Sequence, residues 1–153
     1  MSKRKSALAM LDFGRGVWPY KSSWYWGAAQ GYQGENRIAL NIGHGFGELD
    51  NASEDMLFVD GKAHKLTHGS FTIPNNKQGK PDYMKPWKYD SQDETVKLTF
   101  TPQLFRKDKT NLLFIKSDQN QLFGHYDGEI RLEDETVKIK ALPGFAEAFH
   151  NRW

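Results

Sequence analysis

The chain contains no cysteine, no long apolar run and no large excess of charge of either sign. The lack of cysteine excludes disulfides, thiol nucleophiles, thiolate metal sites and iron–sulfur ligation, and it fits a reducing compartment such as the cytoplasm. No apolar stretch approaches the roughly 20 residues that a membrane-spanning helix needs. The short apolar run over residues 7–11 follows a basic cluster, but it lacks the length and the cleavage site of a signal peptide. We therefore expect a soluble, cytoplasmic protein without a membrane span.

Charge and length limit the kind of partner and the number of domains that we expect. The 153 residues include 21 basic and 19 acidic residues, which are well mixed and leave a formal net charge of +2. Such a balance argues against a nucleic-acid partner, because it provides no extended basic surface. The length suits one domain that buries about two-thirds of its unfolded surface. We expect a disordered tail over residues 1–7 and a single domain over residues 8–153.

Hydrophobic periodicity predicts strands. Apolar and polar residues alternate with a period of two, as in strands that bury one face, over residues 37–42, 96–101 and 136–141. The run 112–115 is apolar throughout, which predicts a strand covered on both sides. No stretch predicts a helix, except for a short last turn at residues 146–150.

The longest alternating segment covers residues 121–132. Gly124 and Gly128 lie on one face of it and permit a sharp bend or the approach of a ring from across the sheet. We predict one bent strand here. The alternative divides the segment into a hairpin at Asp127-Gly128.

Turn residues indicate an antiparallel meander. Asp60-Gly61 lies between two apolar-rich runs and predicts a two-residue hairpin, because both central positions of that turn favour positive φ. The acidic run 133–135 separates the long strand from the next one. We count nine to eleven short strands. Closing such a meander removes its exposed edges, so we predict an all-β fold: an antiparallel meander closed into a lipocalin-like (calycin) barrel.

Aromatic residues are concentrated between residues 12 and 32. This segment holds seven aromatic side chains, and Trp18, Trp24 and Trp26 lie within nine residues of one another. In a strand, Trp24 and Trp26 share one face and Tyr25 takes the other. These rings either line a cavity or fill an aromatic core, and both interpretations remain open.

Three carboxylates lie near these or other apolar residues. Asp12 precedes Phe13, Glu54 precedes the run MLFV, and Glu147 lies within GFAEAF. A carboxyl drawn into an aromatic cavity has a raised pKa and is suited to general acid catalysis. The alternative is an ion pair of Asp12 or Glu147 with Arg15 or Arg152, and the sequence alone favours the ion pair.

Other motifs do not point to a cofactor or a metal. The glycine-rich run GHGFG at residues 43–47 lacks both the dinucleotide fingerprint and the P-loop lysine. His64 and His68 are four residues apart, which separates them by roughly 13 Å along an extended chain. We therefore expect no cofactor and no metal site.

Several motifs together resemble one family. They are LDFGRGVWPYKSSWYWGAAQG, RIALNIGHGFG, the Glu54 segment ending in FVDGK, KPWKYDS, VKLTFTP, QLFGHYDGEI and LPGFAEAFHNRW. Over about residues 8–153 the chain resembles the uncharacterised family known as domain of unknown function 2804. The most specific parts are the opening DFGRG run with its tryptophans and the closing GFAE run with Arg152-Trp153.

The resemblance carries structural and chemical implications. The family is similar in turn to lipocalin-like (calycin) hydratases and cyclases that act on carotenoids and other polyenes, which implies a calycin barrel. Family members carry two related barrel halves, and this chain resembles the C-terminal half. A surface that relatives bury between halves is then covered by a second copy, so we expect a two-fold homodimer. The similarity to polyene hydratases implies that one carboxyl protonates a C=C bond while ring faces stabilise the carbocation.

These observations leave two main functions. The first is the binding of a small apolar or amphipathic molecule inside an aromatic-lined β-barrel, by Arg15, Trp18, Trp24, Trp26 and Tyr126. The second is a cofactor-independent hydratase or isomerase reaction on an unsaturated apolar substrate, by acid/base catalysis at Asp12, Glu54 or Glu147. A third possibility is a structural half that only pairs with another copy.

Overall fold

The structure, a computed structural model, describes residues 9–45, 47 and 53–152, so the predicted tail over residues 1–7 lies outside the described residues. The described part contains nine strands and no helix. The strands are β1 (Lys21–Gln33), β2 (Asn36–His44), β3 (Met56–Val59), β4 (Lys62–Lys65), β5 (Gly69–Thr72), β6 (Trp87–Ser91), β7 (Val96–Leu112), β8 (Ile115–Arg131) and β9 (Thr136–Arg152). No helix among the described residues has the length and apolar character needed to cross a membrane.

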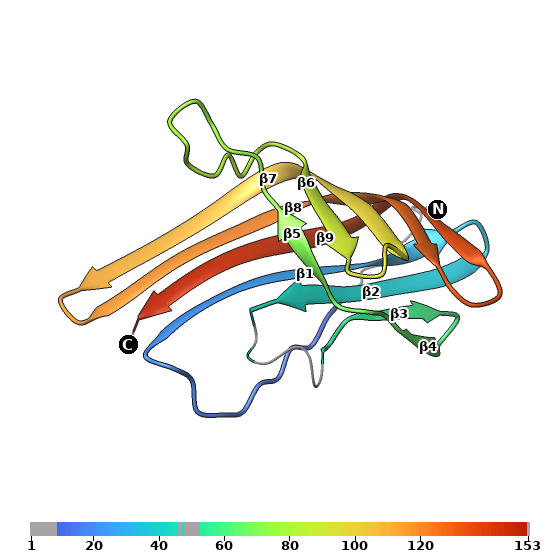
Figure 1. The fold of residues 1–153 in the computed structure, drawn as a ribbon, viewed down its shortest axis with the longest axis horizontal. Coiled ribbons are helices and arrows are strands. Elements are labelled where there is room, and N and C mark those ends of the chain that lie inside the picture. Colours follow the sequence, from blue (N-terminus) through green and yellow to red (C-terminus); the bar gives the residue numbers. More distant parts are fainter. Residues whose placement is uncertain (1–8, 46, 48–52, 153) are drawn as a thin grey trace, which may run out of the picture.

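All nine strands belong to one antiparallel sheet. Its order is β4-β3-β2-β1-β9-β8-β7-β6-β5, so neighbours in the sheet are neighbours in sequence, except where β1 pairs with β9 (Figure 1). This one non-local ladder joins the first strand to the last. The predicted antiparallel meander is confirmed, and the nine strands of the described residues fall inside the expected range. The expectation that the strands are short is wrong for β7, β8 and β9, which have 17 residues each.

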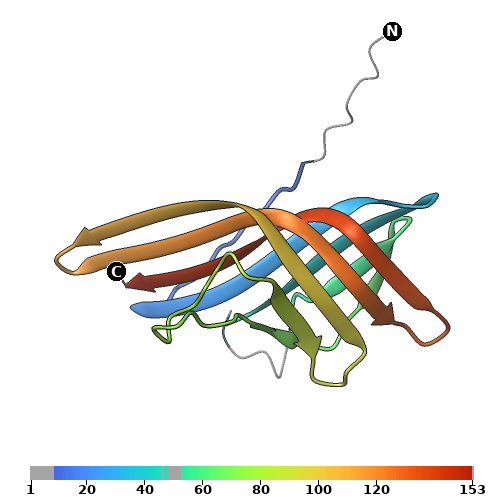
Figure 2. The ribbon, with the colours of Figure 1, turned by 90° about the horizontal axis from the view of Figure 1, so that it is seen from above.

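The sheet is strongly curled into a half-barrel. Its long strands bend across the molecule, and β5 and β6 fold over toward β2 and β3 (Figures 1 and 2). Within the described residues no ladder joins the two edge strands, β4 and β5. The closure into a complete lipocalin-like barrel therefore stays a prediction.

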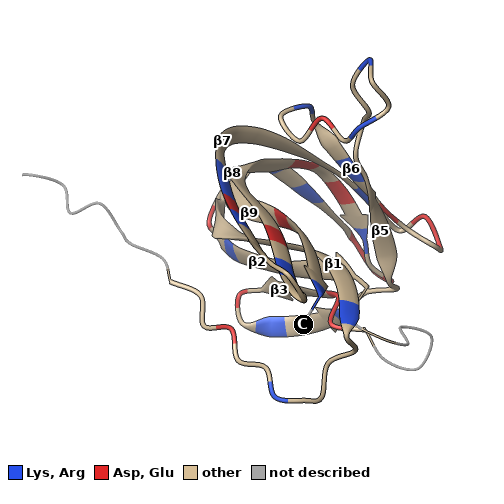
Figure 3. Ribbon diagram, turned by 90° about the vertical axis from the view of Figure 1, so that its left-hand side faces the viewer, with Lys and Arg blue, Asp and Glu red and all other residues tan. Residues whose placement is uncertain are grey.

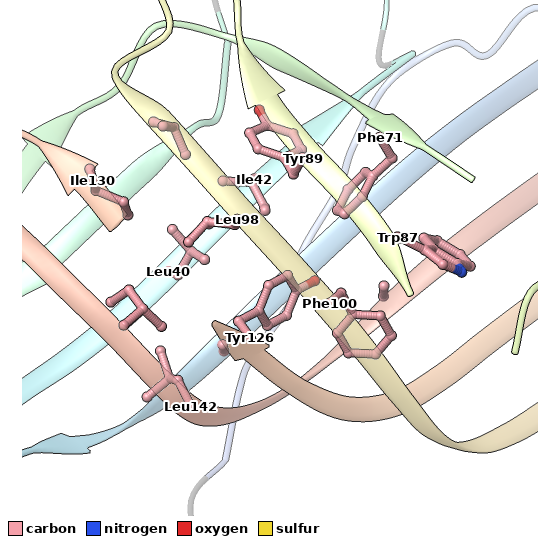
Figure 4. Packing of buried hydrophobic residues seen from close by; sticks show 14 of the residues in the cluster. Leu40, Ile42, Phe71, Trp87, Tyr89, Leu98, Phe100, Tyr126, Ile130 and Leu142 are labelled. Carbon is pink, nitrogen blue, oxygen red and sulfur yellow. The ribbon is translucent and has the colours of Figure 1, made fainter. Parts of the chain in front are cut away.

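The concave face of the sheet holds the core. Its largest fully buried side chains include Trp87, Tyr89, Phe100 and Tyr126, which lie among aliphatic residues of the facing strands (Figure 4). The rings meet mostly edge to face, as aromatic groups prefer; Phe71 and Tyr89, for example, have centroids 4.9 Å apart. The interior of the half-barrel is thus filled by the protein's own side chains.

A buried carboxylate links the two ends of the curl. Asp55, which precedes β3, accepts hydrogen bonds at Oδ1 from the Gly43 backbone N–H (2.7 Å) and from the Tyr89 hydroxyl (2.9 Å). The same hydroxyl accepts a bond from the Gly69 N–H at 2.9 Å. Burial raises the pKa of Asp55, and these donors oppose the rise. The network holds β5 and β6 against the end of β2.

Two local predictions are confirmed. Asp60 and Gly61 form the turn between β3 and β4 with φ values of 50° and 85°, both positive as that hairpin requires. Residues 121–131 lie within the single strand β8, whose pairing with β9 shifts register between Tyr126 and Gly128. The bent strand is therefore the correct interpretation of this segment, and the hairpin alternative is wrong.

Two other predictions are wrong. Residues 112–115 are not a strand covered on both faces: they form the exposed hairpin connection between β7 and β8. Leu113 has a φ of 40° there. Positive φ values are common for glycine and asparagine but uncommon for leucine, so the sequence gives no indication of a turn at this position. Residues 146–150 are not a helical turn but part of β9, because the chain continues to pair with β1 and β8 up to Arg152.

Candidate functional site

The tryptophans of β1 lie on the convex, outer face of the sheet. Tyr25 packs against the core, so the alternation of the strand directs Trp24 and Trp26 to the opposite face. The predicted sharing of one face is confirmed. The expected position is corrected, since these rings lie outside the curl and not within the barrel interior.

The segment before β1 crosses this outer face. Residues 9–20 have no regular secondary structure and run outside the curled sheet (Figure 3). The Gln30 side chain donates a hydrogen bond to the Ala9 carbonyl at 3.0 Å, which attaches the start of the segment to β1. The segment and the outer face together enclose a pocket.

This pocket has a volume of about 280 Å³. It is lined by five aromatic residues, three carboxylates and one glycine: Phe13, Trp18, Trp24, Trp26, Phe149, Asp12, Glu54, Glu147 and Gly14. Six of the eight residues singled out from the sequence are therefore brought together in one place, namely Asp12, Trp18, Trp24, Trp26, Glu54 and Glu147. We call this the outer-face pocket.

Hydrogen bonds and ring contacts fix the tryptophans of the pocket. The Trp26 indole N–H donates to Asn41 Oδ1 at 2.7 Å, and the Asn41 amide donates to the Glu54 carbonyl at 2.9 Å. Trp26 also meets Phe145 edge to face at 4.8 Å, and Trp24 meets Phe149 at 5.3 Å. Their orientation is thus set by neighbours on β2 and β9, as a preformed binding wall requires.

Glu147 is the buried acid of the pocket. Its exposed fraction is only 5%, and the Gln121 side-chain amide donates a hydrogen bond to its Oε1. Burial raises the pKa of Glu147; the Gln121 bond opposes the rise, and the negative charge of Asp12 adds to it. Asp12 and Glu54, by contrast, are exposed at the rim.

The ion pairs proposed from the sequence are not found. Among the described residues, neither Asp12 nor Glu147 forms a salt bridge. The Arg152 guanidinium donates to the Leu113 carbonyl at 3.1 Å. Across the sheet, Glu147 on β9 pairs with Gln121 on β8, and Gln121 pairs with Arg106 on β7. Arg106 is therefore two strands away from Glu147, a distance of roughly 10 Å.

Two predicted site residues lie outside the pocket. Tyr126 is fully buried in the concave core, where its hydroxyl donates to the Phe145 carbonyl at 2.8 Å. Burial, with the nearby charge of Glu147, raises its pKa well above the usual value. Arg15 is exposed on the crossing segment and does not line the pocket.

The candidate ligand-binding residues chosen from the sequence leave out two rings of the pocket, Phe149 and also Phe13, which belongs to the aromatic-rich segment over residues 12–32. The alternation of β9 contains the signal for one of them, because Phe145, Glu147 and Phe149 are two residues apart and share a face. For Phe13 the signal is its place in the aromatic-rich segment 12–32, but this part of the chain lacks a regular period that would assign its side chain to a face. A second hollow of about 470 Å³ lies next to the pocket on the same face, with Met10, Ala28 and Phe145 among its lining residues.

The acids of the outer-face pocket are also the residues to consider for a metal ion. The described residues contain no group of three or more histidine, cysteine, aspartate or glutamate side chains arranged to hold a metal ion. Although three acids line the outer-face pocket, they do not converge as a metal site requires.

Comparison with known proteins identifies the family and nothing finer. The family model described as "Domain of unknown function (DUF2804)" matches residues 1–153. No curated protein and no solved structure matches the chain. The chain belongs to the DUF2804 family, as its motifs predict.

Proposed function

We propose that this member of the DUF2804 family binds a small apolar or amphipathic molecule in the outer-face pocket. The observation that carries the proposal is the convergence of five aromatic side chains from three separate segments on one cavity with a buried carboxylate. A concave, mostly aromatic site with a few polar groups is the usual form of a small-molecule site. The volume of about 280 Å³ limits the ligand, or the bound part of a longer one, to a small size.

The proposal does not depend on a closed barrel. The pocket lies outside the curl, so a lipocalin-like closure by pairing of β4 with β5 would leave its walls unchanged. Both the closure and the similarity to lipocalin-like proteins remain proposals. The interior is filled by side chains, which supports the outer face as the place for a ligand.

A neutral fluorescent probe tests the binding. N-phenyl-1-naphthylamine should quench tryptophan fluorescence, and Trp24→Ala should weaken its binding about tenfold or more while the fold survives. Tyr32→Ala is the matched control, because Tyr32 is an exposed ring on the same strand and lies outside the pocket. Unchanged affinity in Trp24→Ala, or an equal loss in the control, would contradict the proposal.

A second candidate is a cofactor-independent hydratase or isomerase, favoured by the burial of Glu147 beside aromatic rings. A protonated Glu147 would donate its proton to one carbon of a C=C bond, and the tryptophan faces would stabilise the carbocation on the other carbon. Water then adds to the carbocation and returns a proton to the Glu147 carboxylate, which completes hydration; return of a proton from the neighbouring carbon to the same carboxylate instead completes isomerisation. Glu147→Gln should abolish turnover of a polyene substrate and leave the affinity for the neutral probe nearly unchanged. Retained turnover would exclude Glu147 as the acid.

We also propose that the protein is a two-fold homodimer. Large apolar side chains are exposed on the crossing segment and at the β7–β8 connection, where Leu113 is 88% exposed and Phe114 is 76% exposed. Such clustered exposure is typical of surfaces that a partner covers. A second copy of the chain is the partner we propose.

A further inference from the structure

The outer-face pocket combines aromatic rings with acids, and no basic residue is among the described residues that line it. Of its nine lining residues, five are aromatic and three are carboxylates, and none is lysine, arginine or histidine. A site built only for a neutral apolar molecule gains nothing from three carboxylates. The composition therefore carries information about the charge of the ligand.

Glu147 has no cationic partner within the described part of the chain. It is 5% exposed, its hydrogen-bond donor is the neutral amide of Gln121, and no described salt bridge includes it. A buried carboxylate without a cationic partner is costly to ionise. A cation that enters the pocket would supply a positive charge at a place where residues 9–45, 47 and 53–152 supply none.

The aromatic walls suit the same ligand. The faces of aromatic rings attract cations, tryptophan most strongly, and this attraction underlies the recognition of quaternary ammonium groups by aromatic cages. Trp18, Trp24 and Trp26 all line the pocket, and Asn41 fixes the ring of Trp26. The aromatic rings and the acids of the pocket thus favour the same class of ligand, an organic cation.

We infer that the ligand of the outer-face pocket is an organic ammonium cation with apolar substituents. The inference rests on the proposed binding function and adds the charge of the ligand to it. A metal cation does not fit, since the described acids do not form a group able to ligate one. The apolar substituents would contact the rings, while Glu147 and the rim acids Asp12 and Glu54 would face the positive charge.

A pair of probes of the same shape tests the inference. Benzyltrimethylammonium is the cation, and neopentylbenzene, with carbon in place of the ammonium nitrogen, is its neutral counterpart. We expect the cation to bind about tenfold tighter in fluorescence titrations at neutral pH. Glu147→Gln should remove most of this preference by weakening the cation alone.

Two further variants keep the test decisive. Asp12→Asn lies on the crossing segment outside the sheet, so it reports on the pocket even if a change at Glu147 perturbs folding; it should weaken the cation severalfold. Glu35→Gln, an exposed acid in the β1–β2 turn, is the matched control and should leave both affinities unchanged.

The outcomes are separable. Equal affinity for the two probes, or an equal loss in Glu35→Gln, overturns the inference and leaves the binding function intact. Failure of both probes to bind overturns the proposed function together with the inference.

Discussion

Trp26 on β1 and Glu147 on β9 are direct cross-strand partners, and their side chains share the outer face of the sheet. An indole therefore lies beside a carboxylate that is almost completely removed from water. Apolar surroundings of this kind disfavour the ionised form of an acid. The relationship links the stability of the protein to pH.

The effect of pH on stability should change in Glu147→Gln. Because burial raises the folded-state pKa of Glu147 above its ordinary value of 4.5, the folded protein holds this proton more tightly than the unfolded chain does. The free energy of unfolding then falls as pH rises from about 4.5 through the raised folded pKa. Glutamine has no proton to lose, so the stability of the variant relative to the wild type should increase between pH 4 and pH 8 in urea denaturation.

Asp55 does not disturb this comparison. Its pKa is also raised by burial, but it contributes equally to wild type and variant. The other acids of the outer-face pocket, Asp12 and Glu54, are likewise present in both proteins. A stability difference that stays constant across this pH range would show that Glu147 ionises as freely in the folded protein as in the unfolded chain.

Removal of one hydroxyl should weaken the link between β5–β6 and β2. In Tyr89→Phe the Gly69 N–H loses its acceptor and Asp55 loses a donor, and these groups are buried. We expect the free energy of unfolding to fall by about 1–3 kcal/mol. Tyr32→Phe removes an exposed hydroxyl from β1 and should have no measurable effect in the same urea titrations. Equal stability of the two variants would contradict the role of the network.

A methyl group at Gly27 should be destabilising. A Cβ at this position would meet the Tyr126 hydroxyl and lie 2.7 Å from the tip of the Phe71 ring, both within the filled core. We expect Gly27→Ala to cost about 1–3 kcal/mol of stability. Gly16→Ala is the matched control, since a Cβ there has no neighbour within 4 Å. A neutral effect at Gly27 would mean that the core has room to rearrange.

The proposed homodimer predicts a mass near twice 17.6 kDa in light scattering at micromolar concentration. Leu113→Asp with Phe114→Asp should shift this mass to that of a monomer, because charges would replace the most exposed apolar side chains of the β7–β8 connection. Leu104→Ser alters an exposed leucine further along β7 and should leave the dimer intact. A wild-type protein that is monomeric at this concentration would refute the proposal.

Local signals in the sequence predict the parts of this fold that depend on neighbouring residues. Asp60-Gly61 specifies its hairpin through backbone conformation alone, and the alternation around Gly124 and Gly128 identifies one long bent strand. The β7–β8 connection could not be predicted in this way. An apolar run such as residues 112–115 normally indicates burial, whereas here Leu113 occupies an exposed turn with positive φ.

The candidate site depends on pairing between distant residues. The concentration of rings near residues 12–32 and the acids beside them identify most of the outer-face pocket. The side of the sheet on which it lies follows from the register of β1 with β9, which brings Trp26 opposite Glu147, 121 positions later in the chain. No local pattern specifies that register. The path of residues 9–20 cannot be predicted from hydrophobic periodicity either, because this segment has no regular secondary structure.

The pairing of β1 with β9 has a consequence for synthesis on the ribosome. The first four strands are made early, but the strand that covers one edge of β1 ends at Arg152. Until that strand emerges, β1 presents unpaired backbone groups and an aromatic face to solvent, and such edges pair readily with other chains. The sheet can be completed only after β9 has been translated, so β1 is exposed to aggregation for as long as β9 has not emerged.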